Sequence, residues 1–312
     1  KVNKLNIASL KDVLGDMTLT NLLIEELDLS QINFNGNTLT LQCKQLNKIV
    51  GSETFNGSLF LLPKDCRLTE FTLEGISNIQ GDFQCIDYFY VKEFVMPFIR
   101  VAGDMTIALN SGSVNTAAEI EFPKLQEIGG TLTLGTNRNA NNITFPLLKK
   151  ILGSCSVTTY KLKNDIEFTN LESIGTDGAD EQIKFEIEAT NILCPKLKTI
   201  NGKFDIATSS FMFGMEVDKV SYPNVESISE NLSITCPYSD FGSNGILSID
   251  FSGLKSVKGI SISGQGDVTD FSSFKYLFEN NVLTGESQWS VKECGYNPTF
   301  QEMKDGKYKL AE

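Results

Sequence analysis

The fold is decided by the stretch Ile120-Glu121-Phe122-Pro123-Lys124-Leu125-Gln126-Glu127-Ile128-Gly129-Gly130-Thr131-Leu132-Thr133-Leu134. It reads apolar-x-apolar-Pro-x-Leu-x-x-Ile-x-Gly-x-apolar-x-apolar, and the pattern returns around Pro146, Pro195 and Pro223. The position of its leucine recurs at Leu46, Ile76, Ile99, Leu125, Leu148, Leu171, Leu197, Val225 and Leu254. Leu46 and Leu254 are 208 residues and eight steps apart, which gives about 26 residues per repeat, a length typical of solenoid arrays.

Each repeat predicts two short strands joined by a bend. Two segments with period-2 alternation flank the stretch from the proline to the glycine. Proline lacks the N–H that a ladder needs, so we expect it at a corner. We expect the glycine either at positive φ or where the next turn approaches closely. The Leu and Ile side chains point into an interior that one coil cannot bury alone. The sequence therefore predicts a mainly β chain, folded as a parallel β-solenoid of about ten coils.

Two parts are expected along the chain. A β-solenoid repeat domain covers residues 1–265, and a C-terminal capping segment, a short helix plus a strand, covers residues 266–312. Helical spacing runs from about residue 270 to 280, where four side chains are expected to cover the last coil: Phe271, Phe274, Tyr276 and Leu277. The tail with the single tryptophan, Trp289, is expected to complete the cap. Such covers are needed because an exposed ladder edge invites association.

The Pro-x-Leu-x-x-Ile-x-Gly-x-Leu-x-Ile pattern resembles that of the L domains of growth-factor and insulin-type receptors, within the broader leucine-rich-repeat class. With its capped tail, the chain is also similar to uncharacterised secreted leucine-rich-repeat proteins of gut Bacteroides-type bacteria. The resemblance covers about residues 5–265. It implies a right-handed parallel β-solenoid that is secreted or exposed at a cell surface, in particular a bacterial outer surface. The chain departs from the receptors because no cysteine-rich module adjoins the repeat.

The charge of the chain excludes several kinds of partner. The formal net charge is −12, with 27 Lys and Arg against 39 Asp and Glu. The chain therefore lacks the basic surface by which proteins bind nucleic acid or an anionic membrane. No apolar run approaches the roughly 18 residues of a membrane-spanning helix. Because the chain starts at Lys1 and not at methionine, we interpret it as processed, which leaves room for a signal peptide or a lipid anchor upstream.

The sequence has no histidine, which removes Ser-His-Asp and Cys-His nucleophile systems together with every His-ligated metal site. No P-loop and no GxGxxG motif opening a helix occurs, so no nucleotide and no other cofactor is expected. The seven cysteines show no CxxC spacing. Cys155 and Cys194 fall on inward repeat positions and are expected to be buried core thiols. A disulfide such as Cys66 with Cys85 is the alternative for the irregular ones. No catalytic residue and no metal ligand is assigned.

Carboxylate chemistry on neighbouring coils, as in glycan-active β-helix enzymes, is the one enzymatic class that these exclusions leave open. The outward strand positions are mostly small and polar: Asp82 and Gln84, Asp104 and Thr106, Thr131 and Thr133, Ser154 and Ser156, Lys184 and Glu186, Lys203 and Asp205, Asn231 and Ser233. Asp82 and Asp104 form a weak carboxylate pair, expected one coil apart. A solvated sheet face is the simpler interpretation. The acidic insertion at residues 176–181 is expected to be a solvated loop, with a calcium site as the alternative.

Binding residues are expected in loops that exceed the repeat, because the sheet face carries few of the Trp, Tyr and Arg side chains that anchor ligands. One candidate loop holds Tyr88, Phe89 and Tyr90, and another holds Phe211 and Phe213. These side chains could stack on sugar rings or anchor a protein partner. The alternative is that they fold under the loop and extend the core.

The predicted function is a non-catalytic recognition or adhesion protein that binds a glycan or a protein through the loops that interrupt the repeat. Two alternatives stay open. A carboxylate-dependent glycan-active β-helix enzyme needs two acids about 5–10 Å apart in a cleft. A passive envelope scaffold would be distinguished by the absence of an exposed aromatic patch on any face. No nucleic acid and no nucleotide is expected as a partner.

Overall fold

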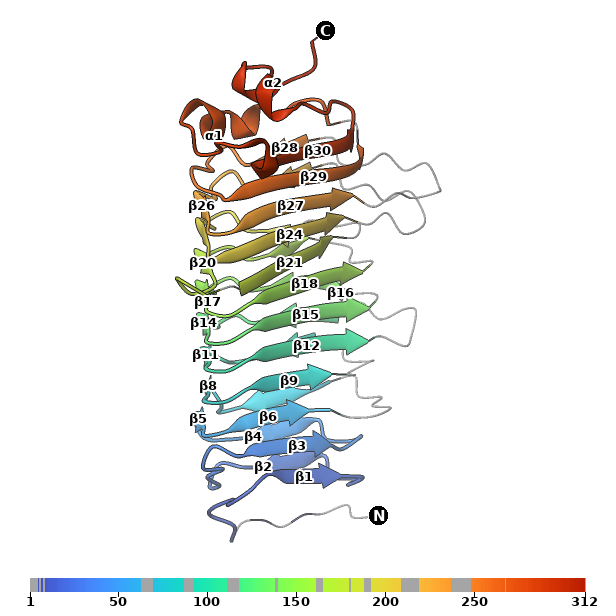
Figure 1. The fold of residues 1–312 in the computed structure, drawn as a ribbon. Helices are drawn as coiled ribbons and strands as arrows, with labels where there is room; N and C mark the ends of the chain where they lie inside the picture. The colour runs from blue at the N-terminus through green and yellow to red at the C-terminus, as the bar shows by residue number, and fades with distance from the viewer. Residues whose placement is uncertain are drawn as a thin grey trace. The chain divides into compact units, whose positions relative to one another are not determined.

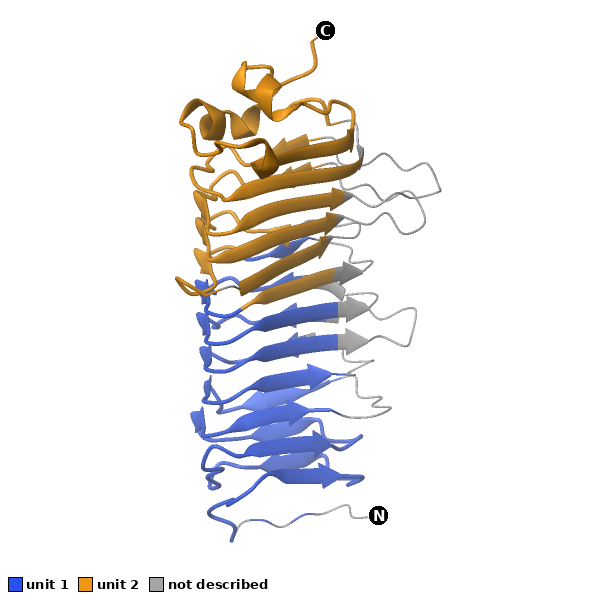
Figure 2. Ribbon diagram, in the orientation of Figure 1, with its two compact units in different colours: residues 1–153, 160–168 blue, residues 154–159, 169–312 orange. Residues whose placement is uncertain are grey.

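The computed structural model describes most of the chain, namely residues 5, 7, 9–62, 70–86, 93–110, 118–137, 140–160, 165–179, 181–187, 192–208, 219–236, 248–266 and 268–311. The chain forms two compact units (Figure 2). Unit 1 consists of residues 1–153 and 160–168, and unit 2 of residues 154–159 and 169–312. The predicted boundary between residues 265 and 266 is a different division, and it stays a prediction.

The turns of unit 1 have three sides, which we call the long, second and third sides (Figure 1). The long strands pair in parallel, each with the next: β1 (Met17–Thr20), β3 (Thr38–Gln42), β6 (Ser58–Leu61), β9 (Phe83–Ile86), β12 (Met105–Asn110) and β15 (Leu132–Asn137). The second side carries β2 (Glu26–Asp28), β4 (Lys48–Val50), β7 (Thr72–Glu74), β10 (Glu93–Val95), β13 (Ala118–Glu121), β16 (Ala140–Thr144) and β19 (Ile166–Glu167). The third side carries β5 (Thr54–Phe55), β8 (Asn78–Ile79), β11 (Arg100–Val101), β14 (Glu127–Ile128) and β17 (Lys150–Ile151).

Unit 2 repeats the same arrangement. Its long strands also pair in parallel, each with the next: β18 (Cys155–Tyr160), β21 (Glu181–Ile187), β24 (Gly202–Thr208), β27 (Asn231–Cys236), β29 (Gly259–Gly266) and β30 (Trp289–Cys294). The second side carries β22 (Ile192–Leu193), β25 (Lys219–Ser221) and β28 (Ser248–Asp250). The third side carries β20 (Ser173–Ile174), β23 (Thr199–Ile200) and β26 (Ser227–Ile228).

The strands follow one cycle along the chain, from long side to second side to third side. Within the described residues this three-strand cycle occurs eight times, from β3 to β26. A two-strand turn precedes it (β1 and β2) and another follows it (β27 and β28). The prediction of a mainly β chain folded as a parallel β-solenoid is therefore confirmed. The expected ten coils correspond to the eight complete turns and the two incomplete ones.

The stretch between the proline and the glycine contains a strand of its own, so the expectation of a simple bend is wrong. In the repeat that opens the sequence analysis this strand is β14, which pairs with β11 on one side and β17 on the other. It places Val101, Ile128 and Ile151 in one column, and all three are buried. A strand of two residues shows no alternation, so hydrophobic periodicity cannot reveal it.

The apolar repeat positions fill the interior, but Leu46 is not at the position predicted for it. Leu46 is buried between β3 and β4, before the second side, whereas the positions from Ile76 to Val225 lie between the second and third sides. The phenylalanines that precede the corner, Phe122, Phe145 and Phe168, have no exposed surface. Neighbouring rings stack with centroids 4.8 Å apart, the strand spacing of a β-sheet. The column is close-packed because each turn adds one ring directly on the ring of the turn before.

The repeat slips by one residue at Ile99, which was predicted to occupy the inward leucine position. Ile99 is 37% exposed, whereas Phe98 is fully buried. Val101 pairs with Ile128 although it follows Pro97 by four residues and Ile128 follows Pro123 by five. This turn is one residue shorter than its neighbour, so the inward position moves back to Phe98.

The corners use proline and glycine in different ways. Pro123 and Pro146 each occupy a turn directly after the second side, as predicted. At Gly130 and Gly153 the reason for glycine is close approach. A Cβ on Gly153 would lie 2.7 Å from the carbonyl carbon of Gly130, far inside van der Waals contact. At Gly175 there are two reasons for glycine: its φ is +83°, and a Cβ there would clash with the carbonyl oxygen of Asn201.

The C-terminal segment covers the last long strands of unit 2 with the short elements η1 (Ser272–Phe274), α1 (Lys275–Glu279), η2 (Glu286–Gln288) and α2 (Phe300–Lys304). Phe271, Phe274 and Leu277 are buried as predicted, but Tyr276 is 43% exposed. Phe278 takes the inward place instead, because it lies one helical turn after Phe274.

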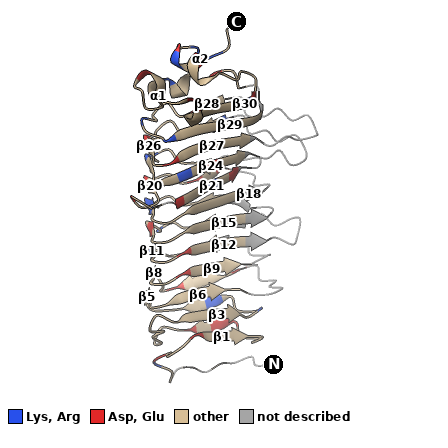
Figure 3. Ribbon diagram, in the orientation of Figure 1, with Lys and Arg blue, Asp and Glu red and all other residues tan. Residues whose placement is uncertain are grey.

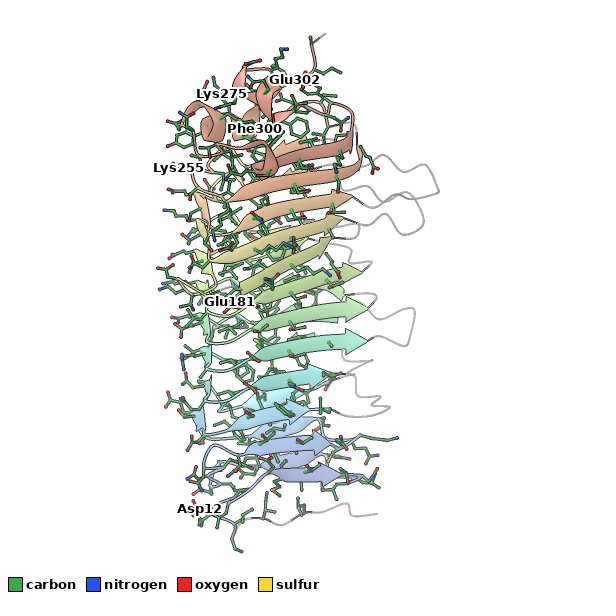
Figure 4. All side chains as sticks on the ribbon, in the orientation of Figure 1. Asp12, Glu181, Lys255, Lys275, Phe300 and Glu302 are labelled. Carbon is green, nitrogen blue, oxygen red and sulfur yellow. The ribbon has the colours of Figure 1, made fainter. Side chains whose placement is uncertain are left out.

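The tail completes this cover, as predicted. Trp289 begins β30, pairs with Ile260 of β29 and donates its indole N–H to the carbonyl oxygen of Pro298 at 2.9 Å. Phe300 of α2 packs on Phe278 with ring centroids 5.5 Å apart (Figure 4).

Candidate functional site

In each unit the carboxyl ends of the long strands lie along one edge, which we call the insertion edge. Parallel pairing places Asn110 beside Asn137 in unit 1, and Ile187 beside Thr208 in unit 2. The arrowheads of the long strands accordingly point to the same side within each unit (Figure 1). The chain leaves every long strand of the solenoid turns at this edge.

The connections that begin at the insertion edge differ widely in length. Two residues join β15 to β16, seven join β12 to β13, ten join β24 to β25, and eleven join β27 to β28. By contrast, five residues join the second side to the third side in each turn from β13 to β26. From the third side to the next long strand the connection is short as well, and the longest of these, six residues, joins β20 to β21. Length variation is thus concentrated at the insertion edge.

The five predicted ligand-binding residues lie outside the described residues. Tyr88, Phe89 and Tyr90 belong to the connection that follows β9, and Phe211 and Phe213 belong to the connection that follows β24. Both connections start at the insertion edge of their own unit. Their role in binding stays a prediction, and so does the alternative that they extend the core.

The outward face of the long strands has the polar character that the repeat predicts. Each predicted outward residue from Asp82 to Ser233 is exposed or half-buried. The alternating residues of the same strands, such as Phe83, Met105 and Leu132, are fully buried. The assignment of inward and outward positions is therefore confirmed.

Asp82 and Asp104, the pair weighed for carboxylate chemistry, hold turns together. Oδ1 of Asp82 accepts the backbone N–H of Asp104 at 2.8 Å, and Oδ1 of Asp104 accepts that of Thr131 at 2.7 Å. Three more side chains at the same position accept from the next turn: Asp16 from Thr38 at 2.8 Å, Ser58 from Asp82 at 2.9 Å and Ser154 from Gln182 at 3.0 Å. We call these five acceptors the acceptor column. Its sequence signal is an Asp or Ser at the start of the long strand.

A charged group on β21 and β24 was not recognised as a cluster from sequence. Lys184 pairs with Glu186, and Lys203 with Asp205 at 2.9 Å. The register sets Lys184 directly opposite Asp205 on the same face. Figure 3 shows charged positions on both strands. We call these four residues the β21–β24 quartet.

The quartet is held in place by hydrogen bonds and ion pairs. Oε2 of Glu186 accepts the hydroxyl of Thr158, on the neighbouring β18, at 2.9 Å. The Lys184 ammonium, and to a lesser degree the Thr158 hydroxyl, hold the pKa of Glu186 below its usual value, although partial burial acts the other way. On the same strand Glu181, which ends the acidic insertion, accepts the hydroxyl of Ser154 at 2.6 Å (Figure 4).

Two cysteines occupy the core position that the repeat predicts for them. Cys155 is fully buried and Cys194 is 6% exposed. Burial raises the pKa of both thiols, and the neighbouring Cys155 adds to the effect at Cys194. Such thiols stay protonated and are poor nucleophiles. Cys85 is also buried, whereas Cys66 lies outside the described residues, so the proposed bridge between them stays a prediction.

Comparison with protein-family models, with curated proteins and with solved structures finds no match for this chain. Within the described ranges, no helix is long and apolar enough to cross a membrane. Those same residues include no group of three or more Cys, Asp or Glu side chains that could hold a metal ion.

Proposed function

We propose that this chain is a non-catalytic recognition or adhesion protein that binds a glycan or a protein through the connections at the insertion edge. The observation that carries the proposal is the concentration of length variation there. The corner from the second to the third side has three to five residues in all eight complete turns, while connections at the insertion edge range from two to eleven. Loops that vary on a constant scaffold are the usual place for binding residues.

A structural reason supports this division. The length of a connection at the insertion edge leaves the pairing of the long strands unchanged, because each strand is already fixed by its neighbours along four to seven residues. The pairing of the strands therefore does not explain why one connection has eleven residues and another has two. The aromatic residues Tyr88, Tyr90, Phe211 and Phe213 belong to a class of side chain that often anchors ligands.

The cellular location is part of the same proposal. The resemblance of the repeat to receptor L domains, and to secreted leucine-rich-repeat proteins of Bacteroides-type bacteria, supports a secreted or surface-exposed protein. A lipid anchor upstream of Lys1 would be compatible with it.

A glycan array tests the proposal directly, together with immobilised mucin and extracellular-matrix proteins. The full chain is compared with two loop variants, Tyr88→Ala with Tyr90→Ala and Phe211→Ala with Phe213→Ala. The matched control is Thr133→Ala on the sheet face. We expect at least one loop variant to lose binding while the control keeps it. Equal binding by all variants, or no binding to either panel, contradicts the proposal.

A further inference from the structure

The ion pairs on the outer sides of the chain mostly join neighbouring turns. Lys48 reaches Glu26 at 3.7 Å and Glu74 at 3.3 Å, each one turn away. The same holds for Arg100 with Glu127 at 2.8 Å, Lys255 with Glu226 at 3.0 Å, and Lys258 with Glu230. These pairs tie successive coils together and have a structural role.

The β21–β24 quartet pairs differently. Lys184 and Lys203 each meet the acid two residues further along their own strand. These ion pairs lie within one strand, and the contacts of the quartet between turns include the hydrogen bond from Thr158 to Glu186 and the placement of Lys184 opposite Asp205. In unit 1 the row that corresponds to Lys184 and Asp205 is uncharged: Thr18, Thr40, Phe60, Gln84, Thr106 and Thr133. The row that corresponds to Lys203 does carry charge in unit 1, at Asp16, Asp82 and Asp104. The two ion pairs of the quartet thus run along their strands, unlike the ion pairs that join neighbouring turns on the other sides.

The charged groups of the quartet are accessible to a ligand. The side chains of Lys184, Glu186, Lys203 and Asp205 are 50%, 37%, 42% and 28% exposed. The register sets a donor opposite an acceptor across the two strands, and the ion pairs set a donor beside an acceptor along each strand. Ammonium groups donate hydrogen bonds and carboxylates accept them, so the quartet places hydrogen-bond donors next to acceptors.

We infer that the quartet is a binding site for an uncharged polysaccharide, an inference that goes beyond the connections at the insertion edge and places a further site on the sheet face of unit 2. A sugar hydroxyl both donates and accepts, so vicinal hydroxyls can bridge an ammonium and a carboxylate. The quartet has no net charge, and the chain carries −12, which repels acidic polymers. The hydroxyls of Ser156 and Ser233 extend the row beyond Lys184 and Asp205, so a linear chain can lie across the strands.

The site is organised before the ligand arrives. Thr158 and the ion pairs already orient the charged groups, so binding an uncharged chain costs little side-chain entropy and breaks no ion pair. Because the ligand carries no charge, its affinity should change little when salt is raised.

The experiment measures the affinity of the full chain for four neutral polymers, a β-glucan, an α-glucan, a mannan and a xylan, with polygalacturonate as the anionic comparison. The test variant is Lys184→Ala with Asp205→Ala, and the matched control is Glu230→Ala with Lys258→Ala, since both conserve net charge. We expect one neutral polymer to bind at least about tenfold more weakly to the test variant, and equally to the control. Glu186→Gln, which removes charge without changing shape, keeps the test valid if the double variant unfolds.

Failure of the inference and failure of the proposed function are distinguishable. Unchanged binding by Lys184→Ala with Asp205→Ala, together with loss in Phe211→Ala with Phe213→Ala, overturns the quartet and leaves the loops. The reverse result supports the quartet and removes the connection at residues 209–218 as the site that binds this polymer. Tighter binding of polygalacturonate, or binding of no neutral polymer, also overturns the inference, while a protein ligand found on the panels still supports the proposed function.

Discussion

At the scale of single residues, stability depends on side chains that stack on their counterparts one turn away. Phe145 lies between Phe122 and Phe168, with 4.8 Å to each ring centroid and no exposed surface. Removal of the Phe145 ring leaves a cavity between the rings of Phe122 and Phe168, and the hydrogen-bonded strands around it cannot move together to fill the space. Leu147, two residues later, is 43% exposed and has much less to lose.

We therefore expect Phe145→Ala to lower the free energy of unfolding by about 3–5 kcal/mol, and Leu147→Ala by less than about 1 kcal/mol. Urea denaturation followed by far-ultraviolet circular dichroism measures both. Similar losses for the two variants would show that the interior is loosely packed.

Glu186 gives a pH dependence of known sign. Its pKa is lowered in the folded state, chiefly by the Lys184 ammonium, so its contribution to stability is present at neutral pH and is lost as the pH falls through the folded-state pKa. The group is more than one-third exposed, which limits the contribution to less than about 1 kcal/mol. Glu186→Gln should thus be slightly less stable than the unsubstituted chain at pH 7. The difference should vanish at about pH 2–3, where the carboxyl is protonated. Thermal unfolding at both pH values measures it, and a difference that grows on acidification would refute the assignment.

At the scale of elements, the acceptor column joins long strands at the point where they begin. Each of its side chains accepts a hydrogen bond from a backbone N–H of the following turn. At this corner the pairing of the strands alone does not provide an acceptor for that N–H. The carboxylate pair that the sequence offers for catalysis, Asp82 and Asp104, is therefore engaged in building the solenoid.

Two substitutions at Asp104 separate its hydrogen bond from its charge. Asp104→Ala removes the acceptor of the Thr131 N–H and should cost about 1 kcal/mol, a low value because the site is open to water. Asp104→Asn keeps an oxygen in place and should cost clearly less. Chemical denaturation of both variants tests this. Equal costs would mean that charge, and not the acceptor, matters.

The same elements show what the sequence can and cannot predict. Alternation identifies the faces of the long strands, so inward residues such as Cys155 are correctly placed. Alternation carries no information on a two-residue strand such as β14, or on a turn shortened by one residue, as at Ile99. The quartet was visible only as outward positions, because pairing within a strand and register across strands need coordinates. Tyr276 and Phe278 lie on different faces of α1, and the spacing of four residues from Phe274 favours Phe278 as the inward residue, which the prediction of Tyr276 overlooked.

At the scale of the whole molecule, the repeat separates a constant scaffold from variable connections. Corners between the second and third sides have three to five residues, and their apolar side chains are buried, as those of Tyr222 and Val225 are between β25 and β26. Connections at the insertion edge change length from turn to turn. If they serve recognition, their side chains should matter for binding and little for stability, and if they extend the core, the reverse should hold.

Replacing a connection by Gly and Ser at unchanged length tests which applies. In residues 209–218 the replacement should change the free energy of unfolding by less than about 1 kcal/mol, because the entropy of closing the loop depends on its length more than on its sequence. The matched control, the same replacement in residues 222–226, removes the buried Tyr222 and Val225 and should cost several kcal/mol. Urea denaturation of the two variants makes the comparison. A loss of several kcal/mol at residues 209–218 would place Phe211 and Phe213 in the core and remove them as binding residues. Retained stability with lost glycan or protein binding would assign that connection to recognition.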